Sequence, residues 1–301
     1  MENNYVIEAH GIWKKYKGFQ LDIPELKIPK GFATALIGEN GAGKTTLLSI
    51  IAGILLQYRG EIRYFDKYTD KDRENIPDVK ELMGYTASGS YYVAHWKLKE
   101  VEKISSVLFK GFHRERFRQW CREMEVGAAG WDPKQKVSSL SDGNRMKLMI
   151  AGVLARDTKL LVMDEPASPL DPVMRDRLCG IIREYLAEDE GQRSIFFSTH
   201  NIADMENVTD YAIIMERGKI VEQGFVEDLK EKYLLVKGDA ADAEKVRDGL
   251  FTCDCGQYGF EGICLSENLD KLAGFQVSTE RPSLTQISVA VMKHFSKVAK
   301  G

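Results

Sequence analysis

The sequence predicts an α/β fold with a mainly parallel core sheet, extended by a helical subdomain and a small α+β appendage. Two observations predict the parallel core. Short apolar segments alternate with segments of helical periodicity, and the apolar segments lack the polar alternation of half-exposed strands. A glycine-rich loop at residues 38–43 directly follows one apolar segment and precedes a helical pattern. The length of 301 residues fits one large domain with an appendage.

The elements of the core follow in order from residue 32. Residues 32–37 form an apolar run typical of a strand, and apolar side chains at residues 47–55 recur at helical spacing. Residues 91–137 also show helical spacing, broken at Gly111 and Gly127, which indicates a mainly helical insert. The other predicted elements are strands at 61–65, 160–163 and 195–198, helices at 142–154 and 172–188, and a hairpin of strands at 211–215 and 219–222.

The pattern changes after about residue 230. The segments that follow suggest a strand at 233–237, a helix at 242–250, a hairpin at 251–265 and a closing helix at 283–295. We therefore expect a main domain over residues 1–230, with its helical subdomain at about 91–155, and a small accessory domain over residues 231–301.

Composition and charge exclude some classes of function. Hydrophobic residues make up 44% of the chain and charged residues 29%, which is ordinary for a globular protein. The net charge of -3 argues against a nucleic-acid binder that relies on bulk electrostatic attraction. No signal-peptide pattern begins the chain, and no segment approaches the roughly 20 apolar residues of a membrane span. We therefore expect any work on a membrane to pass through a partner.

The five cysteines are odd in number and scattered along the chain. Reduced thiols in a cytosolic protein are the simplest interpretation. A metal site at Cys253, Cys255 and Cys264 is the alternative, but this group lacks paired C-x-x-C spacing and a nearby histidine.

The glycine-rich loop fits the phosphate-binding pattern G-x-x-x-x-G-K-[ST]. Its glycines allow backbone N–H groups to point at phosphate oxygens, at the positive end of the following helix. Lys44 is expected to reach the β- and γ-phosphates of ATP, and the Thr45 hydroxyl to bind Mg²⁺. The predicted nucleotide-binding residues of this loop are Gly38, Glu39, Asn40, Gly41, Ala42, Gly43, Lys44, Thr45 and Thr46.

An acidic pair, Asp164 and Glu165, ends the apolar strand at 160–163. Charges at such a position are costly unless they are used. Asp164 is expected to hold the Mg²⁺ shell and Glu165 to orient and polarise the attacking water. Taken alone, the pair also suits a strand that simply enters a turn.

The segment Leu140-Ser141-Asp142-Gly143-Asn144 opens the helix at 142–154. Together with the two preceding motifs it resembles the ATP-binding cassette (ABC) family, whose signature commonly reads L-S-G-G-Q. This sequence departs from that signature at Asp142 and Asn144 but retains Ser141 and Gly143. The resemblance implies that Ser141 and Gly143 contact a γ-phosphate, whereas the segment alone suits an ordinary helix N-cap.

Three further residues match the family in the expected order. Asp171 closes a segment that resembles the D-loop, His200 ends a strand where the family has its switch histidine, and Tyr16 resembles the aromatic residue that stacks on adenine. A lone histidine or tyrosine is usually structural. The resemblance covers about residues 5–228 and implies a P-loop NTPase fold of the ABC type.

Ser88 stands where the family usually has a glutamine that senses Mg²⁺ and contacts the membrane subunit. A serine is shorter, so we expect coupling or turnover to differ from the family norm.

Two surface groups nearby have competing interpretations. The helical spacing of Arg114, Arg118 and Arg122 suits either a solvated face or a contact for a partner or anionic lipid. The aromatic cluster Tyr91, Tyr92, His95 and Trp96 lies in a neighbourhood that meets the membrane subunit in related cassettes, with core packing as the alternative for Trp96.

The resemblance implies an ATP-hydrolysing subunit of an ABC transporter, of bacterial exporter type, that powers a separate membrane-spanning subunit. ATP and Mg²⁺ are the implied cofactors. A second cassette, identical or different, is expected to pair head to tail, and the chain is expected in the cytoplasm on the inner face of the membrane. The alternatives are a soluble ATPase acting in translation or on DNA, and a weakly hydrolysing regulatory cassette. No nucleic-acid partner is expected, and the transported substrate is left open.

Overall fold

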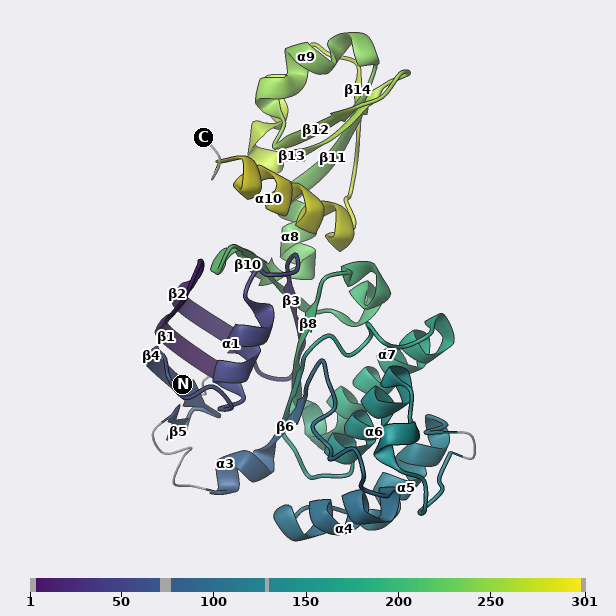
Figure 1. The fold of residues 1–301 in the computed structure, drawn as a ribbon. Helices are drawn as coiled ribbons and strands as arrows, with labels where there is room; N and C mark the ends of the chain where they lie inside the picture. The colour runs from purple at the N-terminus through teal and green to yellow at the C-terminus, as the bar shows by residue number, and fades with distance from the viewer. Residues whose placement is uncertain (1–3, 71–76, 128–129, 299–301) are drawn as a thin grey trace.

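The computed structural model describes residues 4–70, 77–127 and 130–298, and its strands form three sheets. A six-stranded sheet forms the centre, a four-stranded antiparallel sheet flanks it, and a second four-stranded sheet lies near the C-terminus (Figure 1). Among the described residues, no helix is both long and apolar enough to cross a bilayer.

The central sheet has the order β10-β9-β3-β8-β7-β6. All neighbouring strands pair in parallel except β9 and β10, which form the predicted hairpin. The mainly parallel core is therefore confirmed. Its strands are β3 (Ala33–Ile37), β6 (Met83–Thr86), β7 (Leu160–Met163), β8 (Ser194–Thr199), β9 (Tyr211–Glu216) and β10 (Lys219–Phe225).

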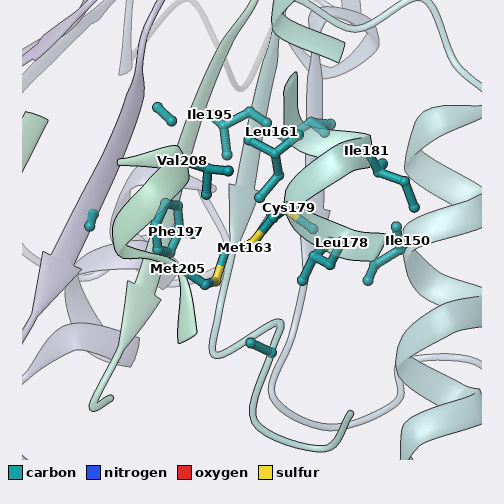
Figure 2. Packing of buried hydrophobic residues seen from close by; sticks show 14 of the residues in the cluster. Ile150, Leu161, Met163, Leu178, Cys179, Ile181, Ile195, Phe197, Met205 and Val208 are labelled. Atoms are coloured by element: carbon teal, nitrogen blue, oxygen red, sulfur yellow. The ribbon is translucent and has the colours of Figure 1, made fainter. Parts of the chain in front are cut away.

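Side chains on the two faces of this sheet enter two different hydrophobic clusters. In β7, Leu161 and Met163 belong to one cluster, while Leu160 and Val162 belong to the other. Successive side chains of a strand point to opposite faces, so both faces of β7 are covered. This explains why the strand reads as a continuous apolar run. Figure 2 shows the first face, where side chains of β7 and β8 meet those of the helices α6 and α7.

Helices α6 (Asp142–Leu154) and α7 (Pro172–Ala187) cover that face, and the insert contributes α4 (Leu98–Leu108) and α5 (Arg114–Glu123). In α5, Arg118 forms an ion pair of 2.9 Å with the buried carboxylate of Glu102, so this arginine belongs to the packing of the insert. The short helix α3 (Pro77–Leu82) precedes β6.

The helix after the glycine-rich loop, α1 (Lys44–Ile51), is shorter than the pattern at residues 47–55 predicts. Gly53 has a left-handed φ of 62°, and Ile54 and Leu55 donate their N–H groups back to the carbonyl of Ser49. The apolar residues after Ile51 therefore lie in a turn, and Ile54 is largely exposed.

The flanking sheet contains a long hairpin that the sequence analysis missed. Strands β1 (Tyr5–Tyr16) and β2 (Phe19–Pro29) pair over nearly their whole length, and β4 (Arg59–Tyr64) and β5 (Tyr68–Thr69) extend the sheet. Its buried side packs with α1 against the second face of the central sheet.

The C-terminal part begins with α8 (Val226–Lys232) and forms a sheet of order β12-β13-β11-β14. Its elements are β11 (Tyr233–Gly238), α9 (Ala243–Val246), β12 (Thr252–Cys255), β13 (Phe260–Leu265), β14 (Val277–Glu280) and α10 (Leu284–Val298). The helix predicted at 242–250 is split, since 3-10 turns flank the four residues of α9.

Helix α10 joins the C-terminal part to the main body of the chain. Near its start, the Glu206 carboxylate accepts hydrogen bonds from the backbone N–H groups of Leu284 (2.8 Å) and Thr285 (3.2 Å) and from the Thr285 hydroxyl (2.9 Å). Near its end, the Ser296 hydroxyl donates to Glu216 at 2.8 Å. One end of α10 is thus attached to the segment that follows β8, and the other end to the last residue of β9.

Candidate active site

A cleft of 820 Å³ opens where the central parallel strands end. Parallel strands bring their carboxyl ends to one edge of the sheet, so the residues directly after β3, β7 and β8 meet there. Ser88 also lines the cleft. The predicted site residues that line it are Glu39, Asn40, Gly41, Gly43, Lys44, Thr45, Thr46, Glu165 and His200.

The loop between β3 and α1 depends on its glycines. Gly41 and Gly43 have left-handed φ angles of 85° and 106°, which side-chain-bearing residues rarely adopt. A Cβ atom on Gly38 would lie 2.6 Å from the carbonyl oxygen of Met215. The loop therefore wraps closely against β9, and Ala42 completes it by accepting the N–H of Gly218 at 2.8 Å.

The N-terminus of α1 fits a phosphate group. Among the described residues, no side chain caps this end, and its first turn contains no acidic residue. The first N–H groups of a helix lack partners within the helix and carry partial positive charge. Lys44, Thr45 and Thr46 begin this helix and line the cleft, so the end of α1 presents donors to the cleft.

Lys44 is held among oxygen atoms inside the site. Its side chain is 6% exposed, and its Nζ donates to the carbonyl oxygens of Gly38 (2.7 Å) and Glu39 (3.3 Å). The same Nζ lies 3.3 Å from Oε1 of Glu165. The ammonium group therefore contacts both the loop and Glu165 of the acidic pair after β7.

Asp164 is fully buried next to the hydroxyl of Thr45. The Thr45 Oγ1 lies 3.0 Å from Oδ2 and 3.2 Å from Oδ1 of Asp164. Mg²⁺ is commonly held by one or two protein oxygens together with substrate phosphates. A hydroxyl and a carboxylate side by side at the foot of the phosphate loop fit this donor set.

Ser198 supports the acidic pair, although the sequence analysis did not identify it. Its buried hydroxyl donates to Oδ1 of Asp164 at 2.6 Å and accepts the backbone N–H of Glu165 at 2.9 Å. The serine lies on β8, the strand that pairs with β7. Only this pairing brings it to the site, so no local sequence signal marks it.

Glu165 sits in an uncommon backbone conformation. Its φ of 51° is left-handed, which costs on the order of 1 kcal/mol for a residue that bears a side chain. The conformation lets its two oxygens face different partners: Oε1 faces Lys44, and Oε2 lies 2.7 Å from Nδ1 of His200. The structure thus brings together the lysine, glutamate and histidine that the motifs predict.

Tyr16 does not line the cleft. It is 42% exposed, and its ring centroid lies 6.3 Å from that of Phe19. Phe19 and Gly18 line the cleft instead. A Cβ on Gly43 would lie 2.7 Å from Cζ of Phe19, so this ring packs directly on the phosphate loop. Phe19 is therefore the aromatic residue nearer to the loop.

Ser141, Gly143 and Asp171 also lie outside the cleft lining, although Asp142 belongs to it. Ser141 caps α6 by accepting the N–H of Asn144 at 3.2 Å. Asp171 caps α7 by accepting the N–H of Met174 at 3.0 Å, and this hydrogen bond holds the pKa of Asp171 below its usual value. A Cβ on Gly143 would lie 2.8 Å from the Pro169 carbonyl oxygen, so the first turn of α6 touches the segment that precedes Asp171.

Comparison with known proteins matches this geometry. The sequence model described as "ABC transporter" matches residues 21–168. The chain is 29% identical to a putative ribose/galactose/methyl galactoside import ATP-binding protein of Geobacillus kaustophilus, over 73% of this chain and 44% of the relative. It is 30% identical to the molybdenum import ATP-binding protein ModC of Brucella suis, over 66% of this chain and 55% of the relative. The chain thus spans about half the length of these two relatives.

A third relative is covered more fully. The uncharacterized ABC transporter ATP-binding protein YhaQ of Bacillus subtilis is 29% identical, over 76% of this chain and 72% of the relative. Among solved structures, the ATP-binding subunit of an ABC transporter has a TM-score of 0.64 at 22% identity, over 75% of this chain and 92% of that chain. The dimeric cassette MJ0796 with ADP and Pi has a TM-score of 0.62 at 20% identity, over 73% and 98%. These structures show a shared fold, and the chain belongs to the ABC transporter family, among its ATP-binding proteins.

Proposed function

We propose that this chain binds and hydrolyses ATP and thereby powers a separate membrane-spanning transporter subunit. The observation that carries the proposal is the convergence of Lys44, Glu165 and His200 in the one cleft that also contains the phosphate loop. A structural glycine loop would not require a buried lysine, a strained glutamate and a histidine at hydrogen-bonding distance.

The contacts suggest how the residues act. The N–H groups at the start of α1 bind the phosphates, and Lys44 exchanges its contact with Glu165 for the γ-phosphate. Thr45 and Asp164 would hold Mg²⁺, which when bound would neutralise charge on the phosphate oxygens. Glu165 is then free to orient the attacking water, while His200 holds the second oxygen of that carboxylate.

We propose that a second cassette completes the site. Ser141 and Gly143 open α6 but do not line the cleft of their own chain, so they are available to a γ-phosphate bound by a partner in a head-to-tail pair. The partner is either a second copy of this chain or a different cassette, and experiment distinguishes the two.

We further propose that an apolar groove of 630 Å³ receives the membrane-spanning subunit. Tyr91, Tyr92 and Trp96 line it, as does the exposed Leu108. Trp96 is half-buried, so it both packs against the core and lines the groove. The groove also contains the buried Arg156, whose Nε has no hydrogen-bond partner among the described residues.

Ser88 favours one further candidate, a cassette with slow turnover. Ser88 lines the cleft where the family's longer glutamine would stand, and a serine reaches a metal ion only through water. Slow hydrolysis would leave ATP binding and partner docking intact.

A pull-down of tagged Glu165→Gln protein from native membranes with Mg-ATP tests the proposal. We expect a multi-span membrane protein among the recovered partners. Leu108→Asp should reduce its recovery, while Tyr258→Asp, a control at an exposed position outside the groove, should not. Recovery of ribosomes or nucleic acid without a membrane protein would instead support a soluble ATPase.

A further inference from the structure

Two cysteines lie side by side on the edge strand β12. Cys253 and Cys255 flank Asp254, and residues two apart on a strand point to the same face. Their Sγ atoms are 3.6 Å apart. Two strand residues span roughly 6.6 Å between Cα atoms, which is within the range that a disulfide bridges. The sulfur atoms must approach one another by about 1.5 Å to reach bonding distance, which requires a bend of the backbone at Asp254.

The surroundings of this pair favour thiol chemistry. All five cysteines are described, and three of them, Cys121, Cys179 and Cys264, are buried. Cys255 is exposed, and Cys253 is half-buried against a small hydrophobic cluster. Because β12 is an edge strand that pairs only with β13, it can bend without breaking a second ladder. The pair is thus both accessible and deformable.

A metal site suits the pair less well. Within the described ranges, no three or more histidine, cysteine or acidic side chains are grouped so that they could hold a metal ion. Structural zinc requires four ligands, so two thiols alone do not build such a site.

We propose that Cys253 and Cys255 form a reversible dithiol–disulfide site that low-molecular-weight disulfides, such as glutathione disulfide, oxidise. The thiolate of Cys255 attacks one sulfur of glutathione disulfide, the S–S bond breaks, and one glutathione leaves and takes up a proton. The thiolate of Cys253 then attacks Sγ of Cys255 and releases the second glutathione. The two protein thiols lose two electrons and two protons, and glutathione disulfide is reduced to two thiols.

The order of attack follows from exposure. Cys255 faces solvent and meets the reagent first, whereas Cys253 is partly covered. Burial, and then the neighbouring thiol of Cys255, raise the pKa of Cys253 to about 11. Since only the thiolate attacks, closure of the bridge should accelerate about tenfold for each pH unit between roughly 7 and 9.

Closure also has a structural consequence. Asp254, between the two cysteines, accepts a hydrogen bond from Nζ of Lys293 on α10 at 2.8 Å. A bend in β12 at Asp254 would change this contact. We therefore expect faster amide hydrogen exchange in β12 after oxidation.

The test oxidises the full chain with glutathione disulfide, traps remaining thiols by acid and alkylation, and maps the peptides by mass spectrometry. We expect wild type to lose two hydrogen atoms on the peptide containing Cys253 and Cys255, with no glutathione attached. Cys253→Ser should instead retain glutathione on Cys255, and Cys255→Ser should stay unmodified. A dithiol reagent should restore the wild-type protein.

Two results would overturn the proposal. One is stable glutathione on Cys255 of wild type at all pH values, since it would show that Cys253 does not attack. The other is a bridge between two chains, since it would show that the two thiols of one strand do not meet. The replacement Cys255→Ser lies at an exposed position, so a folding defect should not obscure the result.

Discussion

Replacing Ser198 by alanine tests whether β8 holds the acidic pair in place. The variant loses a hydrogen bond to the buried carboxylate of Asp164 (2.6 Å) and one from the N–H of Glu165 (2.9 Å). A hydrogen bond to a charged group contributes about 1.5–3 kcal/mol and a neutral one about 1 kcal/mol. We therefore expect the free energy of unfolding to fall by about 3 kcal/mol.

Ser194 on the same strand is the matched control. It is also fully buried, but among the described residues its hydroxyl accepts one hydrogen bond, from the N–H of Gly31 at 2.9 Å, and contacts no carboxylate. Ser194→Ala should therefore cost about 1 kcal/mol. Urea unfolding of both variants measures the difference of about 2 kcal/mol, and Mg²⁺ titration of ATP hydrolysis should show a higher requirement in Ser198→Ala alone. Equal losses of stability in the two variants would show that Ser198 does not hold the acidic pair.

The remaining predictions concern three other contacts. Lys44→Ala should weaken ATP binding roughly 10- to 100-fold, because it removes a charged donor to the phosphates, and unchanged affinity by calorimetry would contradict the assignment. The pKa of Asp171 is lowered in the folded state, so the ionised carboxylate stabilises the fold. This stabilisation is present above about pH 4 and is lost as pH falls through the folded-state pKa. Asp171→Asn keeps the helix cap without titrating, so the variant should not lose this stabilisation in acid. Superimposable acid unfolding curves of wild type and variant would contradict the prediction. Glu206→Ala should destabilise α10 by about 1–2 kcal/mol, seen as faster hydrogen exchange, while Glu206→Gln should retain much of the protection.

The central sheet could be predicted because its strands are buried on both faces. Leu160 to Met163 read as a continuous apolar run, and the glycine-rich loop before α1 marks where the nucleotide end of the sheet lies. The β1–β2 hairpin could not be recognised in this way. Its strands alternate buried and exposed residues, as in Ile23 and Pro24, and that weaker signal was overlooked.

The residues of the candidate site likewise divide into those that the sequence predicts and those that it does not. Lys44, Thr45 and Asp164 could be predicted because their motifs are local in sequence, and the structure brings them together. Ser198 and Phe19 could not, because each reaches the site only through strand pairing or loop packing. Helix α1 was extended past Ile51 for a related reason, since helical spacing of apolar residues outweighed the signal of Gly53.

ATP hydrolysis in this cleft is tested most directly by measuring Mg²⁺-dependent phosphate release and ATP binding in parallel, in wild type and in Glu165→Gln. We expect that the wild-type chain releases phosphate, and that the variant binds ATP with similar affinity but loses release by on the order of 100-fold or more. Equal rates of release in the two proteins would contradict the role of Glu165 and, with it, the assignment of this cleft as the site of hydrolysis.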